Sequence, residues 1–283
     1  MRAYILLAAA SLAITTTTAF ADPSARALYV ERRGLIEADA RCHLFDPPVR
    51  AALQVTALQA RGVLLRGGWS LDQVGQLEQA TVEAAQQRAC NDPRTRSAAL
   101  IARQAYNSSF RSNVMEFPGW SRAWSARRVA GSDGWRLRQD VPGPMAANFG
   151  VRQSASGEQL VLILPAANEQ SGPSNAQLEL RNPNRPAGAL DLATRMAGGL
   201  EATAPDPLNS ISLAQSARLI EHPGWFQTTI VFVFPNAAFR MLCQLDPRES
   251  VALNLATPAG PERLLVEVGD IAAAAGFLST RAD

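Results

Sequence analysis

The spacing of apolar residues changes near residue 115, and this change divides the chain into two halves that need different secondary structure. Before it, apolar residues recur every three or four positions, which is typical of amphipathic helices. After it, they form short or alternating runs between Gly, Pro and Asn, which is typical of strands. We therefore predict an α+β chain, with a helical domain over residues 22–114 and a β-rich domain over residues 115–283.

The first half predicts a bundle of about four helices. Asp46, Ser70 and Asp92 stand just before three of the predicted helices, where their side chains can cap free N–H groups. Short connections between four helices are typical of an up-down bundle or of a close relative of that fold. The helical pattern covers residues 24–45, 49–65, 71–89 and 94–110.

The cysteines provide a check on this topology. Cys42 ends the first predicted helix and Cys90 ends the third. In an up-down bundle these two helices run the same way, so the cysteines lie at one end and can form a disulfide in an oxidising compartment. Closing such a loop contributes on the order of 4 kcal/mol in the chain-entropy model. Cys243, in an apolar stretch, is predicted to be a buried structural thiol, with a reactive thiol as the alternative.

The second half predicts a mainly antiparallel β-rich domain, a sandwich or an open barrel, with one or two small helices. Two strand pairs are centred on the turns at residues 131–134 and 156–157. Loops are predicted around residues 165–175 and 182–210, which are rich in Pro, Gly and Asn. Further strands are predicted over residues 175–182, 226–234, 250–258 and 262–269, and small helices over 236–245 and 270–279.

Two nearly identical pentapeptides occur in this half, EFPGW at residues 116–120 and EHPGW at 221–225. The residues after each copy share only strand character, which favours two independent turns over a duplicated domain. Pro-Gly suits the central positions of a type II turn, because Gly readily adopts a positive φ. We predict that Trp120 opens the β-rich half and Trp225 opens its most apolar strand, each as a core anchor.

The N-terminal residues predict export. Arg2 precedes an apolar run, and Ala19-Phe20-Ala21 matches a signal-peptidase site, so we expect residues 1–21 to be a signal peptide cleaved after Ala21. The apolar run is too short for a permanent span, and no later segment is long and apolar enough to cross a membrane. The absence of Lys indicates a GC-rich genome, and we predict a location in the Gram-negative periplasm or outside the cell.

Charge and motifs exclude several classes of function. Without Arg2 the basic count falls from 27 to 26, against 25 acidic residues, so the chain has no overall attraction to nucleic acid. A chain without Lys cannot use a catalytic or P-loop lysine. Two His and three Cys without a C-x-x-C pair do not form a metal motif, and no nucleotide or calcium motif is present, so we predict no metal and no cofactor.

Two catalytic interpretations involve the histidines. The first is a Cys42 nucleophile activated by the adjacent His43, but adjacent helical residues point in different directions, and the predicted disulfide uses the thiol. His222 could serve as the base of a hydrolase that acts on an envelope component, if a Ser or an acid lies within hydrogen-bonding reach.

A hairpin over residues 120–138 combines tryptophan with arginine. On one sheet face these side chains could bind an anion or a glycan by stacking and bidentate hydrogen bonds. The alternative, which we favour, is a hairpin with Trp in the core and Arg at the solvated edge. The candidate ligand-binding residues of the chain are Trp120, Trp124, Arg127, Arg128, Trp135, Arg136 and His222.

Several segments carry a resemblance to known proteins. RCHLFDPP, LLRGGWS, CNDPRT, FPGWSRAWSARR, GWRLRQ, LDPRESV and VEVGDIAAAAGFL, after a signal peptide, resemble uncharacterised secreted proteins of GC-rich α-proteobacteria. More distantly, the order of Trp-initiated hairpin, sheet and small-residue terminal helix in residues 120–280 resembles the invasion-associated locus B family, which implies a periplasmic β-rich protein. Neither resemblance implies an activity. The sequence as a whole favours a non-enzymatic, envelope-associated binding or accessory module. Its partner is unknown, and the candidates are an envelope component and another periplasmic protein.

Overall fold

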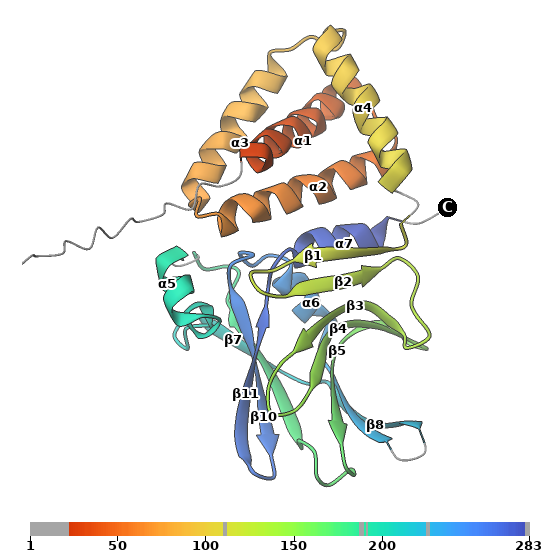
Figure 1. The fold of residues 1–283 in the computed structure, drawn as a ribbon, viewed down its shortest axis with the longest axis vertical. Coiled ribbons are helices and arrows are strands. Elements are labelled where there is room, and N and C mark those ends of the chain that lie inside the picture. Colours follow the sequence, from red (N-terminus) through yellow and green to blue (C-terminus); the bar gives the residue numbers. More distant parts are fainter. Residues whose placement is uncertain (1–22, 110–111, 187–189, 191, 225–226, 281–283) are drawn as a thin grey trace, which may run out of the picture.

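The structure is a computed structural model that describes residues 23–109, 112–186, 190, 192–224 and 227–280. Within these residues the chain has the predicted α+β organisation, with four helices followed by two antiparallel sheets and small helices. The four helices lie on one side of the molecule and the sheets on the other, with α7 between them (Figure 1). The predicted signal peptide and Trp225 lie outside the described residues.

The four predicted helices are confirmed. Ser70 and Gln73 form a reciprocal capping box at the start of α3, with hydrogen bonds of 3.1 and 2.8 Å. The Asp92 carboxylate caps α4, whereas Asp46 occupies the N-cap position of α2 without a side-chain cap hydrogen bond. The helices are α1 (Pro23–Cys42), α2 (Pro47–Arg66), α3 (Leu71–Gln86) and α4 (Pro93–Ser109).

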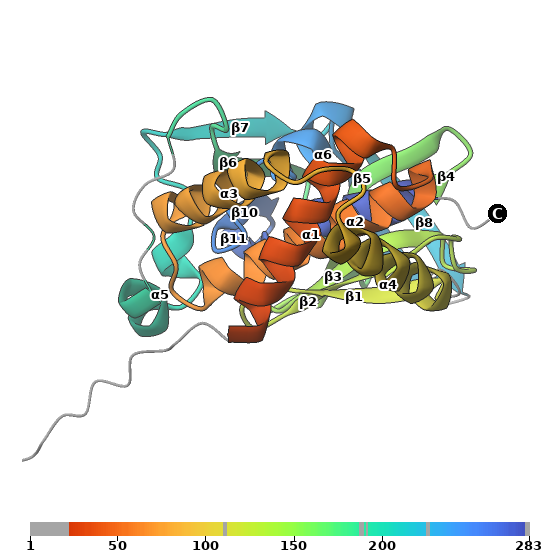
Figure 2. The ribbon, with the colours of Figure 1, turned by 90° about the horizontal axis from the view of Figure 1, so that it is seen from above.

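The four helices form two small cores instead of the single core of an up-down bundle. α1 packs on α2 and passes between α3 and α4 (Figure 2). One apolar cluster joins α1, α2 and α3 around Tyr29 and Leu64, and the other joins α1, α2 and α4 around Leu35 and Leu53. Thus α3 and α4 each cover one end of the α1–α2 pair.

The predicted disulfide between Cys42 and Cys90 is confirmed, with Cα atoms 5.5 Å apart. The disulfide joins the C-terminal end of α1 to the segment that follows α3, and Tyr29 of α1 donates to Glu78 of α3. These two contacts show that α1 and α3 run in the same direction. Cys243 is free, and burial raises the pKa of its thiol to about 12. A thiol with so high a pKa is almost entirely protonated at neutral pH, which agrees with a structural role.

The strands of the described residues form two antiparallel sheets. The seven-stranded sheet has the order β1 (Val114–Pro118), β2 (Ala123–Arg127), β3 (Trp135–Val141), β4 (Ala147–Ser154), β5 (Gly157–Ala166), β9 (Gln227–Val233) and β8 (Ala217–Gly224). The four-stranded sheet has the order β11 (Gly260–Glu267), β10 (Ser250–Thr257), β6 (Asn175–Arg181) and β7 (Ser210–Ala214).

The main core lies between the two sheets. Alternate residues of β5 and β9, such as Leu162 and Phe232, meet alternate residues of β6 and β10, such as Leu178 and Leu253, and all four are fully buried. Two small helices, α6 (Asn236–Leu242) and α7 (Ile271–Ser279), close this core. The two sheets with their shared core agree with the predicted β-rich domain.

The helical region docks on the β-rich region through α2 and α7. Arg66 of α2 forms a bidentate ion pair with Asp270, with N–O distances of 2.6 and 2.9 Å and both side chains largely buried. A Cβ at Gly62 would overlap the Asp270 carboxylate, so glycine permits this close approach. Val55, also on α2, is part of the main core. The two regions are therefore packed together and share buried residues.

The structure differs from the predictions at several elements of the second half. The strands β1, β7 and β8 were not predicted, and the predicted loop at 182–210 contains α5 (Leu192–Gly198) and the 3-10 helix η1 (Glu201–Thr203). The predicted turn at Pro118-Gly119 is also wrong. Pro118 ends β1, Gly119 does not have a positive φ, and its N–H donates to the Arg122 carbonyl, so the turn centres on residues 120–121. In the second pentapeptide, residues 221–224 belong to β8.

Candidate functional site

The predicted Trp/Arg hairpin is formed by β2 and β3, and two of its tryptophans point into the protein. Trp124 is 1% exposed and donates its indole N–H to the carbonyl oxygens of Glu267 and Val268, at 3.1 and 2.8 Å. Trp135 is buried in a separate cluster with Val161 and other residues of β5 and β9. Both rings therefore belong to the core, as the favoured interpretation of the hairpin expects.

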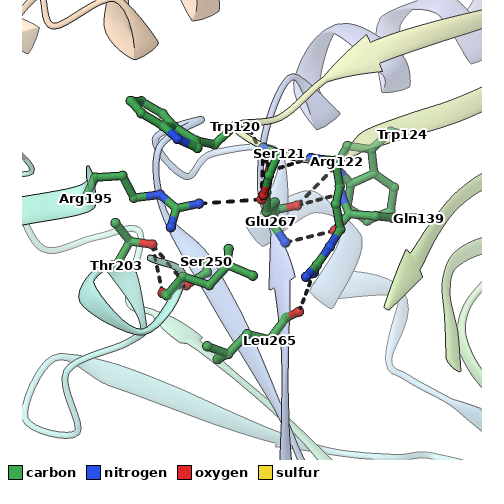
Figure 3. A network of polar contacts seen from close by, with 11 residues as sticks. Trp120, Ser121, Arg122, Trp124, Gln139, Arg195, Thr203, Ser250, Leu265 and Glu267 are labelled. Carbon is green, nitrogen blue, oxygen red and sulfur yellow. Dashed lines mark hydrogen bonds and ion pairs between the residues drawn. The ribbon is translucent and has the colours of Figure 1, made fainter. Parts of the chain in front are cut away.

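Trp120 lies in the turn between β1 and β2, and this turn surrounds the carboxylate of Glu267 (Figure 3). The backbone N–H groups of Trp120, Ser121 and Arg122 donate to the carboxylate at 2.6, 3.1 and 3.3 Å. The Ser121 hydroxyl donates to it as well. Gly119 allows this approach, because a Cβ there would overlap the carboxylate. The turn is thus fixed to β11 by a side chain that is 2% exposed.

Arg195 reaches the same carboxylate from α5 (Figure 3). Its Nη2 lies 3.5 Å from Glu267, and its guanidinium lies 5.5 Å from the ring centroid of Trp120, within the range of a cation–π contact. The side chain is 5% exposed, and this burial lowers the pKa of Arg195 while Glu267 opposes the change. The ring of Trp120 is half-buried and covers this internal ion pair, so the prediction of Trp120 as a core anchor is wrong.

The network around the Glu267 carboxylate is better suited to stabilising the fold than to binding a ligand. The Glu267 oxygens accept several hydrogen bonds from one turn, and the carboxylate forms an ion pair with Arg195 of α5. The carboxylate therefore already has its partners inside the protein. The indole of Trp124 and the amide of Gln139 bind the backbone of the same residue. The sequence did not single out Glu267 or Arg195, because their partners are distant in the chain.

Two further arginines of the hairpin, Arg128 and Arg136, also have partners inside the protein. Arg128 lies 4.2 Å from the ring centroid of Phe277. Arg136 donates to the carbonyls of Arg127 and Leu278, and pairs with Glu158. Arg127 is half-exposed. The structure thus brings Trp120 and Trp124 to Glu267 but does not bring the predicted ligand-binding residues together on one open face.

His222 lies on β8, exposed to solvent. Its neighbour Glu221 pairs with Arg152 through hydrogen bonds of 2.7 and 2.8 Å. Within the described ranges no hydrogen bond reaches the His222 side chain. The hydrolase hypothesis requires a Ser or an acid bonded to this imidazole, and the described residues do not supply one.

Among the residues with described positions, no group of three or more His, Cys, Asp or Glu is arranged to hold a metal ion. No helix in the described part of the chain has both the length and the apolar character needed to cross a bilayer.

Comparison with family models, with curated proteins and with solved structures finds no match for this chain. The resemblances noted in the sequence stay predictions.

An open polar groove lies on the outer face of the four-stranded sheet. Gln177, Asn254 and Arg263 are direct cross-strand partners on β6, β10 and β11, and they alternate with core leucines, so they share the outer face. Together with Asn175 they line a groove of about 380 Å³, whose other lining residues are Leu255, Ala256, Pro261 and Glu262. We call these four residues the polar groove. Strand alternation in the sequence could have placed each of them outward, but not beside the others.

Proposed function

We propose that this chain is an exported, envelope-associated binding module that acts through its polar groove and not through covalent catalysis. The groove is the observation that carries the proposal. It gathers three amide side chains and one guanidinium from three adjacent strands on one open surface. Convergent polar side chains in a concave surface are the usual features of a ligand site.

Two features support export. The N-terminal residues match a signal peptide. The Cys42–Cys90 disulfide suits an oxidising compartment, since disulfides of this structural kind are rare where thiols are kept reduced.

The frame behind the groove supports a binding role. The groove residues lie on strands, which hold side chains more accurately than loops do. The sheet is joined to the helical region by Arg248, which pairs with Asp246 and donates to the Trp69 carbonyl at 3.2 Å. Such a frame can present the groove in one fixed geometry.

Fractionation and cosedimentation test this proposal. We expect the expressed full chain to yield an oxidised protein in the periplasmic fraction, with a mass that begins at Asp22. Purified residues 22–283 should cosediment with washed envelopes of an α-proteobacterium. Gln177→Ala with Asn254→Ala should reduce this binding several-fold, whereas Gln153→Ala, an exposed glutamine on a strand of the other sheet, should not.

Two results would contradict the proposal. One is a chain that stays in the cytoplasm with Cys42 and Cys90 reduced. The other is an exported chain whose cosedimentation is absent, or is equally strong in the groove variant and in the parent protein.

A further inference from the structure

We infer that the polar groove binds an uncharged oligosaccharide through its hydroxyl groups. The inference rests on the proposed function and gives the ligand class of the same site. It depends on three properties of the groove: which hydrogen-bonding groups are free, which charge surrounds them, and how firmly they are held.

The free groups of the groove include both donors and acceptors. The Gln177 amide oxygen accepts from Ser212 at 3.2 Å, which leaves its NH2 group to donate. The Asn254 NH2 group donates to Glu179 at 3.1 Å, which leaves its amide oxygen to accept. Asn175, exposed at the start of β6, offers both functions. A sugar hydroxyl donates and accepts at once, so neighbouring hydroxyls match such alternating groups.

The charge around the groove disfavours an anionic ligand. Arg263 is its single cation, and Nη1 lies 3.0 Å from Glu201 while Nη2 lies 3.8 Å from Glu179. Glu262 also lines the groove, so three carboxylates against one guanidinium leave the local charge negative. A phosphate, a uronic acid or nucleic acid would meet repulsion here, whereas an uncharged sugar would not.

The groove side chains are held before any ligand arrives. The Glu179 carboxylate accepts one hydrogen bond from the Asn254 amide and another, of 3.0 Å, from the Ser210 hydroxyl. It therefore fixes the orientation of the Asn254 amide. The β10–β11 pairing is regular from Ser250–Glu267 to Thr257–Gly260, and in Figure 1 this hairpin extends away from the helices. Less conformational entropy is lost on binding to a site that is already ordered.

The groove lining contains no aromatic side chain, so stacking does not add to affinity. Hydrogen bonds to sugars replace hydrogen bonds to water, and their net gain is small. We therefore expect dissociation constants on the order of 0.1–1 mM for a tetrasaccharide.

Nuclear magnetic resonance on oxidised residues 22–283 tests the inference. The probes are cellotetraose and the tetramer of N-acetylglucosamine, both uncharged, and trigalacturonate as the anionic comparison. We expect saturable shifts of the side-chain NH2 signals of Gln177 and Asn254 with at least one uncharged probe. Gln177→Ala and Asn254→Ala should each weaken binding about tenfold, and Gln153→Ala should leave it unchanged.

Several outcomes would overturn the inference. One is the absence of a saturable shift with either uncharged probe at concentrations up to about ten times the expected dissociation constant. Another is tighter binding of trigalacturonate than of the uncharged probes. The third is equal binding by the parent protein and both groove variants. Near-ultraviolet circular dichroism should show that the variants are folded. If the chain binds envelopes through the groove but no uncharged sugar, the inference fails and the proposed function stands.

Discussion

Glu267 is a buried carboxylate whose hydrogen-bond donors come from a turn 147 residues earlier in the chain. Nothing in the local sequence VEVG indicates that pairing, because the residue lies at an outward position of a strand whose covering segment is not adjacent. Arg195 was missed for a related reason: it lies on a seven-residue helix inside a segment rich in Pro, Gly and Asn. At the scale of single residues, sequence patterns predict burial better than they predict partners.

The network around Glu267 predicts a large effect for Glu267→Gln. The amide would remove the counter-charge of Arg195 and place an NH2 group against backbone N–H donors, which should cost about 3 kcal/mol of unfolding free energy or more. Urea denaturation of the variant and of the parent protein measures this change in unfolding free energy. The control is Glu169→Gln, at a side chain that is 60% exposed and 4.0 Å from Arg218, where we expect a change below about 1 kcal/mol. Equal effects at the two sites would refute a stabilising role of the network.

The raised pKa of Asp270 predicts how the stability of the protein depends on pH. Burial raises the pKa of this carboxyl, although Arg66 opposes the change, so the folded chain holds the proton more tightly than the unfolded chain does. An unfolded aspartate titrates at about pH 3.9. The contribution of Asp270 to stability is therefore greatest below that pH and is lost as the pH rises towards its raised folded value.

The comparison of Asp270→Asn with the parent protein isolates this contribution. The lowered pKa values of Asp39 and Glu78 act in the opposite direction but are present in both proteins, so they cancel in the difference. Urea denaturation at several values between about pH 3 and pH 6 should show the difference moving in favour of the variant as pH rises. A constant difference, or one moving the other way, would show that the folded-state pKa is not raised.

Helices and strands with a regular period were predicted well, and those without one were missed. The four helices and the strands β2 to β6 and β9 to β11 follow patterns that continue for several residues. β1 ends at Pro118 and β8 contains Pro223, whereas β7 starts where the predicted Pro-, Gly- and Asn-rich loop ends. α5 lies in a segment rich in Pro, Gly and Asn, where composition predicts a loop. The register that aligns Gln177 with Asn254 depends on strand pairing, which periodicity does not determine.

Two glycines provide a matched test of the contact between α2 and α7. Gly62→Ala places a methyl group where the Asp270 carboxylate lies, so we expect destabilisation by about 1–3 kcal/mol. Gly75, in the interior of α3, has open space around an added Cβ, and Gly75→Ala should stabilise the chain by about 0.5–1 kcal/mol. Thermal unfolding followed by circular dichroism compares the two. Stabilisation by both substitutions would show that α2 can move away from Asp270 at little cost.

At the scale of the molecule, the two regions depend on each other. α2 contributes Val55 to the core between the sheets, and its Arg66 pairs with Asp270 at the start of α7. Residues 112–283 expressed alone would expose the side of α7 that packs on α2. We expect this fragment to unfold at a lower temperature than the parent protein and to bind the dye ANS. A fragment with the parent's thermal stability would show that the β-rich region folds independently.

The change of period near residue 115 marks a boundary of secondary structure, but Val55 and Asp270 lie on opposite sides of it and are both needed at one interface. Gene fusion or exchange at that point would separate α2 from the surface that it covers. The helical half is therefore poorly suited to transfer as a module, and we expect insertions or deletions in this lineage to fall at exposed hairpin ends such as residues 258–259 instead.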